Sequence, residues 1–175
     1  MTVTDPREEY DDLVVWRSRE VLGSERFEEA ATSEAATVGW VVLGFAFDDA
    51  DRVLLIEQPW ADGCLAPGGI LDPGESFPET VVRELEEETG VRVSPVRPHA
   101  VDEFTFVNER TGETGGWTSV TFEATAETTD IDVDPGLDDE TILDADWFEC
   151  LPEHVFRPEF TETVYRRCLD NRASR

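Results

Sequence analysis

The best-defined local structure in this sequence is a helix whose two ends can both be identified from the residues. Ser76 precedes Glu79 by three positions, which is the capping-box pattern that begins a helix. Gly90 follows at the position where a left-handed residue usually ends one. Between them, apolar side chains recur every four residues from Phe77 to Leu85 and form one stripe. The sequence therefore predicts an amphipathic helix that packs its stripe against a sheet.

The same helix carries four glutamates in five positions, and like charges at this spacing repel one another. Glu84, Glu87 and Glu88 stand at i, i+3 and i+4 and share a face, whereas Glu86 falls outside this cluster and is interpreted as solvated. Three clustered carboxylates are costly unless a cation neutralises them. Their hard oxygen donors suit Mg²⁺, Mn²⁺ or Ca²⁺ better than zinc. Arg83, one turn before Glu87, can hold a carboxylate in orientation. The pattern indicates a site for a metal-bridged phosphate.

Composition gives a competing interpretation of these acids. The chain has 41 acidic and 14 basic residues, a formal charge of −27, and every basic residue is arginine. Such a charge opposes a compact state unless salt screens it. The profile resembles that of proteins from halophiles with molar salt in their cytoplasm, so most single carboxylates are expected to serve solvation. Leu, Ile, Val and Phe nevertheless make up 45 of 175 residues, which is more than a disordered chain usually contains.

Other classes of protein find no support in the residues. There is no signal peptide, no long apolar run for a membrane and no basic patch for nucleic acid. Three scattered cysteines and two histidines show no metal-ligand spacing. We expect a soluble cytoplasmic protein, and the sequence leaves open whether it is a monomer or a homodimer.

The order of elements predicts an α/β/α sandwich with a mixed sheet. Residues 1–36 are read as an N-terminal extension of uncertain structure, and residues 37–175 as the main domain. Residues 13–16 fit either a helix or a strand, and residues 28–37 resemble a connector. The expected strands are 38–47, 53–56, 101–107, 117–126 and 142–148, with a bend at 65–71 and a closing helix at 157–171.

The helix and the residues before it resemble the signature of the Nudix hydrolase family. The spacing is Gly69, five residues, Glu75, seven residues and then RELEEETGV from Arg83 to Val91. Every defined position of the signature is matched, which is far more specific than a lone glycine-rich loop. Weaker similarity around it extends from about Val38 to the C-terminus.

The resemblance implies roles for the matched residues. Glu84, Glu87 and Glu88 would bind the divalent ions, Mg²⁺ or Mn²⁺, with help from the Gly69 carbonyl. Glu75 would support the metal site, and Arg83 would orient a neighbouring carboxylate. In family members the general base is either a glutamate of the signature or an acid on a downstream loop. Glu84 is the first choice here, and the downstream candidates are Glu140, Glu127 and Asp130.

The resemblance also implies a pyrophosphohydrolase that acts on a nucleoside diphosphate linked to another moiety. Nucleotide sugars or ADP-ribose, nucleoside triphosphates and dinucleoside polyphosphates all remain open as its small-molecule nucleotide substrate. The alternative is a non-catalytic Nudix domain that senses a nucleotide and regulates a partner. An isopentenyl diphosphate isomerase ranks low because its Cys–His segment has no counterpart. Trp60, Trp117 and Phe104 are candidates for stacking on a base.

Overall fold

A mixed sheet of seven strands runs through the computed structural model, which describes residues 3–136 and 141–175. The strands are β1 (Val14–Leu22), β2 (Trp40–Phe47), β3 (Val53–Glu57), β4 (Gly68–Ile70), β5 (Val93–Asn108), β6 (Thr114–Ala126) and β7 (Asp144–Phe148). They lie in the order β1-β5-β6-β2-β3-β7, and β4 pairs with β2. The pairs β1–β5 and β2–β6 are parallel, while the others are antiparallel.

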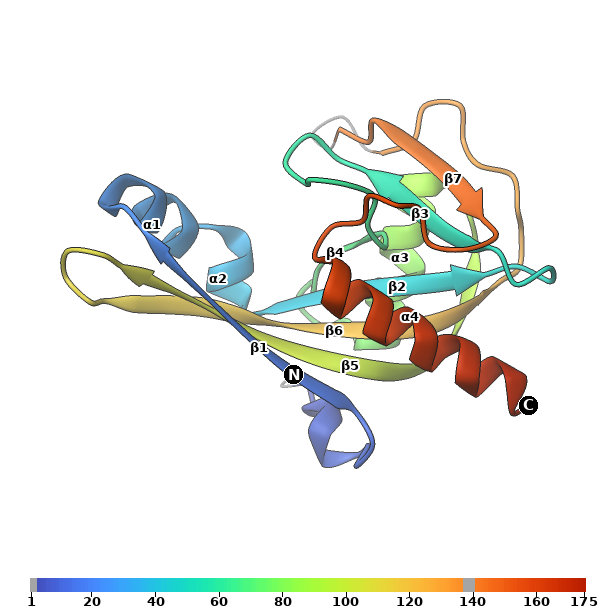
Figure 1. The fold of residues 1–175 in the computed structure, drawn as a ribbon, viewed down its shortest axis with the longest axis horizontal. Helices are drawn as coiled ribbons and strands as arrows, with labels where there is room; N and C mark the ends of the chain where they lie inside the picture. Colours follow the sequence, from blue (N-terminus) through green and yellow to red (C-terminus); the bar gives the residue numbers. More distant parts are fainter. Residues whose placement is uncertain (1–2, 137–140) are drawn as a thin grey trace.

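Helices cover both faces of this sheet, which confirms the α/β/α sandwich (Figure 1). They are the short 3₁₀ helix η1 (Pro6–Glu8), α1 (Ser24–Ala31), α2 (Glu34–Val38), α3 (Phe77–Thr89) and α4 (Pro158–Ala173). One apolar core joins α3 to the sheet, and a second joins α4 to the opposite face. No helix of the described residues is long and apolar enough to cross a membrane.

Helix α3 forms as its sequence predicts. Both bonds of the capping box between Ser76 and Glu79 are present, and Gly90 ends the helix with a φ of 77°. Val81 and Leu85 are fully buried against β2. A Cβ atom at Gly44 would lie 2.9 Å from a Leu85 methyl carbon, so the glycine allows this close approach. The glutamate-bearing face is thereby fixed relative to the strands.

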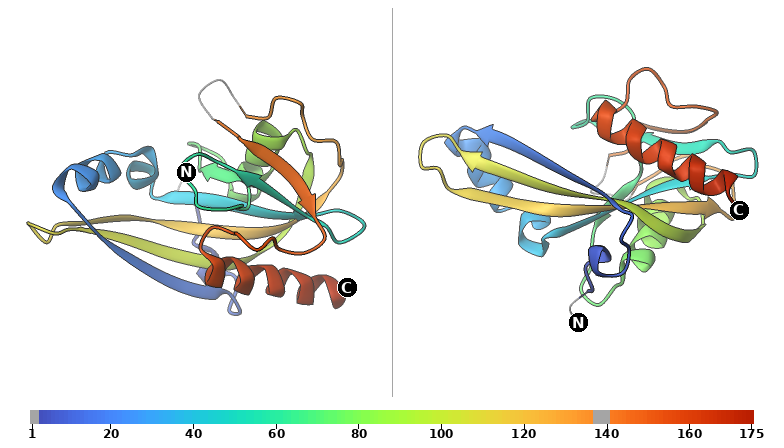
Figure 2. Two further views of the ribbon diagram at one scale, coloured as in Figure 1. Left: turned by 45° about the horizontal axis from the view of Figure 1, so that its top comes forward. Right: turned by 60° about the horizontal axis from the view of Figure 1, so that its bottom comes forward.

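The prediction of a connector at residues 28–37 was wrong, because most of this segment lies in α1 and α2. Phe27 of α1 packs edge-on against Phe106 of β5, with ring centroids 5.4 Å apart, and Ser33 caps α2. Upstream, β1 settles the ambiguity at residues 13–16 by pairing in parallel with β5 along its whole length. Figure 2 shows β1, α1 and α2 beside the long β5–β6 hairpin. Tertiary contacts that are remote in sequence thus order this segment, and the domain boundary at residue 37 stays a prediction.

Strand β5 begins eight residues before the predicted start at Val101. The added part contains Pro95 and Pro98, and proline is unfavourable within a central strand because it lacks an N–H for the ladder. The register with β6 shifts between Pro95 and Arg97 and again between Pro98 and Ala100. These bulges accommodate the prolines within a paired strand.

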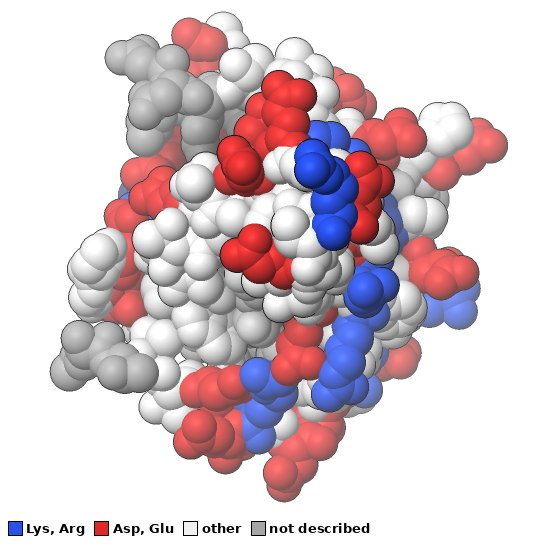
Figure 3. All heavy atoms as spheres, turned by 90° about the vertical axis from the view of Figure 1, so that its left-hand side faces the viewer, with Lys and Arg blue, Asp and Glu red and all other residues white. Residues whose placement is uncertain are grey.

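Surface charge is organised into local pairs. At least 11 of the 14 arginines form ion pairs with carboxylates. Figure 3 shows one face, where arginine side chains lie next to acidic ones. Because the acidic residues outnumber the arginines almost threefold, most carboxylates still depend on water and salt for neutralisation.

Deleting residues 1–32 is expected to lower the free energy of unfolding by about 3–6 kcal/mol. The reason is that Leu22 and Phe27 are buried against Phe106, and burying each such side chain contributes about 1.5–3 kcal/mol. Denaturant unfolding of both chains in molar KCl measures the difference. An unchanged stability would mean that the segment is energetically independent of the sheet.

Candidate functional site

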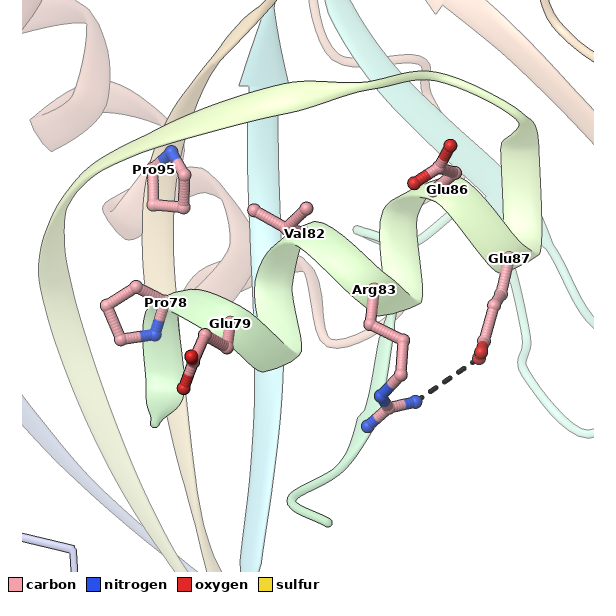
Figure 4. A pocket seen from close by; sticks show the side chains of 7 residues that line it. All are labelled: Pro78, Glu79, Val82, Arg83, Glu86, Glu87 and Pro95. Atoms are coloured by element: carbon pink, nitrogen blue, oxygen red, sulfur yellow. Dashed lines mark hydrogen bonds and ion pairs between the residues drawn. The ribbon is translucent and has the colours of Figure 1, made fainter. Parts of the chain in front are cut away.

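The glutamates of α3 divide between the inner and outer sides of the helix. Glu84 and Glu88 are buried, with 4% and 0% of their surface exposed, and Glu87 is partly exposed. Glu86 is exposed, and Figure 4 shows it pointing away from the side on which Arg83 and Glu87 meet. The predicted separation of Glu86 from the other three is therefore present in the structure.

Arg83 is the hub of the carboxylate cluster. Its guanidinium donates two hydrogen bonds to Glu75, at 2.8 and 3.0 Å, and one each to Glu84 at 2.7 Å and Glu87 at 3.2 Å. A fifth, of 3.0 Å, reaches the Ile70 carbonyl. These carboxylates raise the pKa of Arg83, the bonds to Glu75 having the largest effect. One cation thus fixes three acids and ties α3 to β4.

The buried Glu88 side chain lies between the end of β3 and the start of β4. The edge of β2 that faces away from β6 pairs with two strands: with β3 at Phe47 and with β4 from Val41 to Leu43. Strands β3 and β4 therefore separate from each other along β2. The Glu88 carboxylate accepts 2.7 Å and 3.0 Å hydrogen bonds there, from the Gly68 N–H and the Gln58 side chain. The sequence did not indicate either of these hydrogen bonds. A polar residue directly after the buried strand 53–57 was the available signal for Gln58.

Gly69 lies directly against Glu84. A Cβ atom at this position would lie 2.4 Å from both the carboxyl carbon and Oε1 of Glu84. Such a distance cannot be tolerated, so only glycine leaves this carboxylate where it is. The backbone of β4 and the acidic face of α3 are therefore in direct contact.

Gly69→Ala is expected to lower turnover at least about tenfold, because the new methyl group must displace the Glu84 carboxylate. The measurement is kcat on the best substrate at saturating Mg²⁺. Gly23→Ala is the matched control, since its Cβ would meet the nearest atom at an ordinary 3.5 Å. Equal turnover of Gly69→Ala and the parent would contradict a role for this contact.

Glu75 is held ionised by its surroundings. The bonds from Arg83 lower the pKa of its carboxyl group, with a further contribution from the Thr80 hydroxyl at 3.0 Å, while burial opposes them. Since its folded pKa lies below the ordinary 4.5, the ionised form stabilises the fold. This contribution is complete above pH 4.5 and is lost as the pH falls through the folded pKa.

The stability difference between the wild type and Glu75→Gln is therefore expected to be constant from about pH 7 down to about pH 5 and to shrink at lower pH. Denaturant unfolding across this range at constant salt measures it. A difference that grows on acidification would have the wrong sign for a carboxyl group with a lowered pKa.

The two downstream acids that the structure describes, Glu127 and Asp130, both lie at the surface. Glu127 is exposed and accepts a 2.5 Å hydrogen bond from Ser94, and Asp130 is exposed. Glu140 lies outside the described residues. The loop does reach α3, because the Gly136 N–H donates to the Glu87 carbonyl at 3.1 Å. A role for any of these acids as general base stays a prediction.

The three aromatic candidates occupy two separate places. Phe104 and Trp117 pack on each other, with ring centroids 4.7 Å apart, in the cluster that also holds Phe106. Trp60 follows β3, is 65% exposed and packs edge-on against Phe156. Trp60 is therefore the ring that is available to a ligand near the β3 end of the site.

Two cavities flank the cluster, each of about 540 Å³. One lies between the end of β3 and β7, and its lining includes Gln58, Cys64, Asp144 and His154. The other is a shallow groove on the outer side of α3, next to Pro95 (Figure 4). The first contains Gln58, the side chain that contacts the buried Glu88, whereas the groove is lined by Arg83 and Glu87 of the cluster itself. Because it is the more enclosed of the two, the first cavity is the better candidate for binding the part of a substrate that lies beside the carboxylates.

Sequence comparison places these residues within a known domain. The model of the NUDIX domain matches residues 37–164. The uncharacterized Nudix hydrolase YvcI of Bacillus subtilis (strain 168) is 40% identical over 57 residues, which are 33% of this chain and 35% of that protein. The match thus spans about a third of that relative's length.

Comparison of the folds gives the same result. A UDP-X diphosphatase aligns with a TM-score of 0.56 at 22% identity, covering 86% of this chain and 73% of that one. An ADP-ribose pyrophosphatase from Streptococcus suis 89-1591 aligns with a TM-score of 0.53 at 19% identity, covering 78% and 91%. A MutT protein from Methanosarcina mazei Go1 gives 0.52 at 23%, covering 73% and 93%. These similarities concern the architecture.

Proposed function

The chain belongs to the NUDIX domain family, and on that premise we propose that it is a divalent-metal-dependent pyrophosphohydrolase. Its substrate would be a nucleoside diphosphate linked to another moiety. The observation that carries the proposal is the array of carboxylates around Arg83. Glu75, Glu84 and Glu87 all bond to this one guanidinium, and Glu88 lies buried next to them on α3.

The residues present fit a hard divalent cation. Glu84, Glu87 and Glu88 supply oxygen donors from one helix, and Gly69 lies against Glu84 so closely that a Cβ would occupy the same space. Oxygen-only sites of this kind suit Mg²⁺ or Mn²⁺. These three glutamates and the Gly69 carbonyl are the proposed ligands. When bound, the ions would neutralise the diphosphate and favour ionisation of the attacking water.

The protein's own residues then provide orientation and a base. Glu84 is the proposed general base, and the bond from Arg83 to its Oε1 fixes the direction in which the carboxylate faces. Glu75 affects Glu84 only indirectly, because its two hydrogen bonds with Arg83 hold the guanidinium in place. Little covalent chemistry is required of the chain, since water would attack one phosphorus in line, lose its proton to Glu84, and displace the second phosphate-bearing product as the bond to the bridging oxygen breaks.

We further propose that the cavity between β3 and β7 takes part of the substrate beside the diphosphate. Gln58 connects the two places physically, because it lines this cavity and donates to Glu88. Trp60 lies next to the lining residues Pro59 and Ala61, and its exposed ring is the proposed stacking surface for a base or sugar.

A substrate panel tests the function. The full chain in molar KCl with Mg²⁺ or Mn²⁺ is assayed against nucleotide sugars, ADP-ribose, nucleoside triphosphates and dinucleoside polyphosphates. We expect phosphate-bearing products from at least one compound and none after chelation of the metal. Tight nucleotide binding without turnover across the panel would contradict the enzyme and favour the sensing domain instead.

A further inference from the structure

Three side chains with different donor atoms meet beneath α4, on the face of the sheet opposite α3 (Figure 1). They are His99 of β5, Glu123 of β6 and Cys168 of α4, with 2%, 0% and 0% of their surface exposed. One nitrogen, one oxygen and one sulfur atom of this trio all lie within 4.8 Å of one another. The trio is separated in sequence and in space from the glutamates of α3.

The hydrogen bonds around the trio leave one polar atom without a partner. His99 Nε2 lies 2.8 Å from Glu123 Oε2, which also accepts a 2.8 Å bond from Asn171. Arg175 pairs with the other carboxylate oxygen. The second ring nitrogen of His99, Nδ1, is buried with no partner among the described residues. In a neutral ring one nitrogen is a donor and the other an acceptor, so any tautomer or charge state of His99 leaves a buried group unsatisfied.

We propose that His99, Glu123 and Cys168 bind a borderline transition-metal ion of the Zn²⁺ class. Nitrogen, oxygen and sulfur donors in one place are the ligand set that such an ion prefers, whereas Mg²⁺ binds oxygen donors. A thiolate and a carboxylate carry two negative charges and balance the charge of a divalent ion, while Arg175, whose side chain is partly exposed, pairs with the other carboxylate oxygen of Glu123. If the ion binds one ring nitrogen of His99, the other nitrogen can donate a hydrogen bond to a carboxylate or to water. Neither ring nitrogen is then left without a partner.

Binding would proceed with release of a proton. Burial is the largest cause that raises the pKa of the Cys168 thiol, and the nearby Glu123 raises it further, so without metal the thiol stays protonated. The incoming ion takes the sulfur as a thiolate, and the S–H proton leaves to solvent. Metal–ligand distances of about 2.0–2.3 Å would require the 2.8 Å hydrogen bond between His99 and Glu123 to open and the Cys168 sulfur to move closer. Asn171 and Arg175 already contact the carboxylate, at Oε2 and Oε1 respectively.

The site would be structural. It would join β5, β6 and α4. Without an ion, β5 and α4 meet in the apolar core around Phe160 and Val164, and β6 and α4 meet through the Asn171–Glu123 hydrogen bond. The ion would stabilise the docking of α4 and take no part in diphosphate hydrolysis, since α3 lies on the other face of the sheet. The proposed metal site is therefore independent of the proposed enzyme function, and disproof of one would leave the other unaffected.

Co²⁺ is the probe, because thiolate coordination gives it a charge-transfer absorption that carboxylates and imidazoles do not give. The full chain is refolded with Co²⁺ and freed of excess metal. We expect about one equivalent of thiolate-bound Co²⁺ in the wild type and loss of the absorption in Cys168→Val, which keeps the buried volume close to that of the parent. Cys150→Ser and Cys64→Ala are the controls that should retain it.

Two further variants keep the thiol and remove another donor. His99→Asn and Glu123→Gln are each expected to weaken Co²⁺ binding by at least about 10–100-fold, with folding checked by circular dichroism. Zn²⁺ should raise the unfolding temperature of the wild type and of Glu87→Gln, but not that of Cys168→Val. No thiolate absorption in the wild type, or the same absorption in Cys168→Val, would overturn the proposal and leave a metal-free His99–Glu123 pair.

Discussion

Glu87→Gln is expected to reduce kcat/KM by about 100-fold or more while changing the free energy of unfolding by less than about 0.5 kcal/mol. The expected loss of activity follows from removing a proposed oxygen ligand, because changes to groups that only support metal ligands already cost about 10–100-fold. The small effect on stability follows from the position. The Glu87 side chain is 30% exposed and has a single 3.2 Å bond with Arg83, and it adjoins other carboxylates that repel it.

Glu86→Gln is the matched control for this experiment. The substitution is chemically identical, the position is adjacent, and the side chain points away from the cluster (Figure 4). Its turnover and its dependence on Mg²⁺ should both match those of the parent. Steady-state kinetics at several Mg²⁺ concentrations, combined with thermal unfolding, distinguish lost ligation from lost folding. Full activity of Glu87→Gln would show that the metal ligands have been assigned wrongly.

Arg83→Lys is expected to lower kcat by about 10–100-fold and the free energy of unfolding by about 1–3 kcal/mol. Lysine keeps the charge, but its ammonium group cannot reproduce five hydrogen bonds in a plane to four different residues. Glu75 loses a paired bond, and Glu84 loses the donor that fixes its orientation. Because the side chain is 24% exposed, solvent compensates for only part of this loss.

A purely structural role for Arg83 would lower stability without changing the response to metal. If Arg83 instead orients the carboxylates of the site, the Mg²⁺ concentration for half-maximal activity should rise in Arg83→Lys. This concentration is measured well below the unfolding temperature of the variant. Arg92→Lys, at an exposed position just after α3, is the control and should behave like the parent. Parent-like kcat and Mg²⁺ dependence in Arg83→Lys would contradict the orienting role.

Helix α3 and its chemistry could be predicted because they depend on local spacing. The capping box, the apolar stripe and the common face of Glu84, Glu87 and Glu88 all follow from helical periodicity over 15 residues or fewer. No tertiary contact is needed to place these groups on one side of one helix. The same holds for Glu86, which the periodicity assigns to solvent and the structure places there.

The errors fall where structure depends on contacts remote in sequence. Residues 28–37 contain no large apolar side chain that could show a helical period, and the neighbouring Leu22 and Phe27 bury against Phe106, about 80 residues away along the chain. Pro95 and Pro98 argue locally against a strand, yet bulges opposite β6 accommodate them. Gln58 and Gly68 reach Glu88 only because β3 and β4 diverge along one edge of β2.

The amino-acid sequence by itself determined the sandwich class, the capped helix and the common face of its carboxylates, since these follow from periods of two to four residues. Only the tertiary structure decided the second half of each contact: Gly69 against Glu84, Gln58 and Gly68 on Glu88, and the trio of His99, Glu123 and Cys168 beneath α4. The physical reason is that hydrogen bonding and metal ligation act over a few ångströms in space. Which residues come that close depends on strand register and helix docking, which no short stretch of sequence contains.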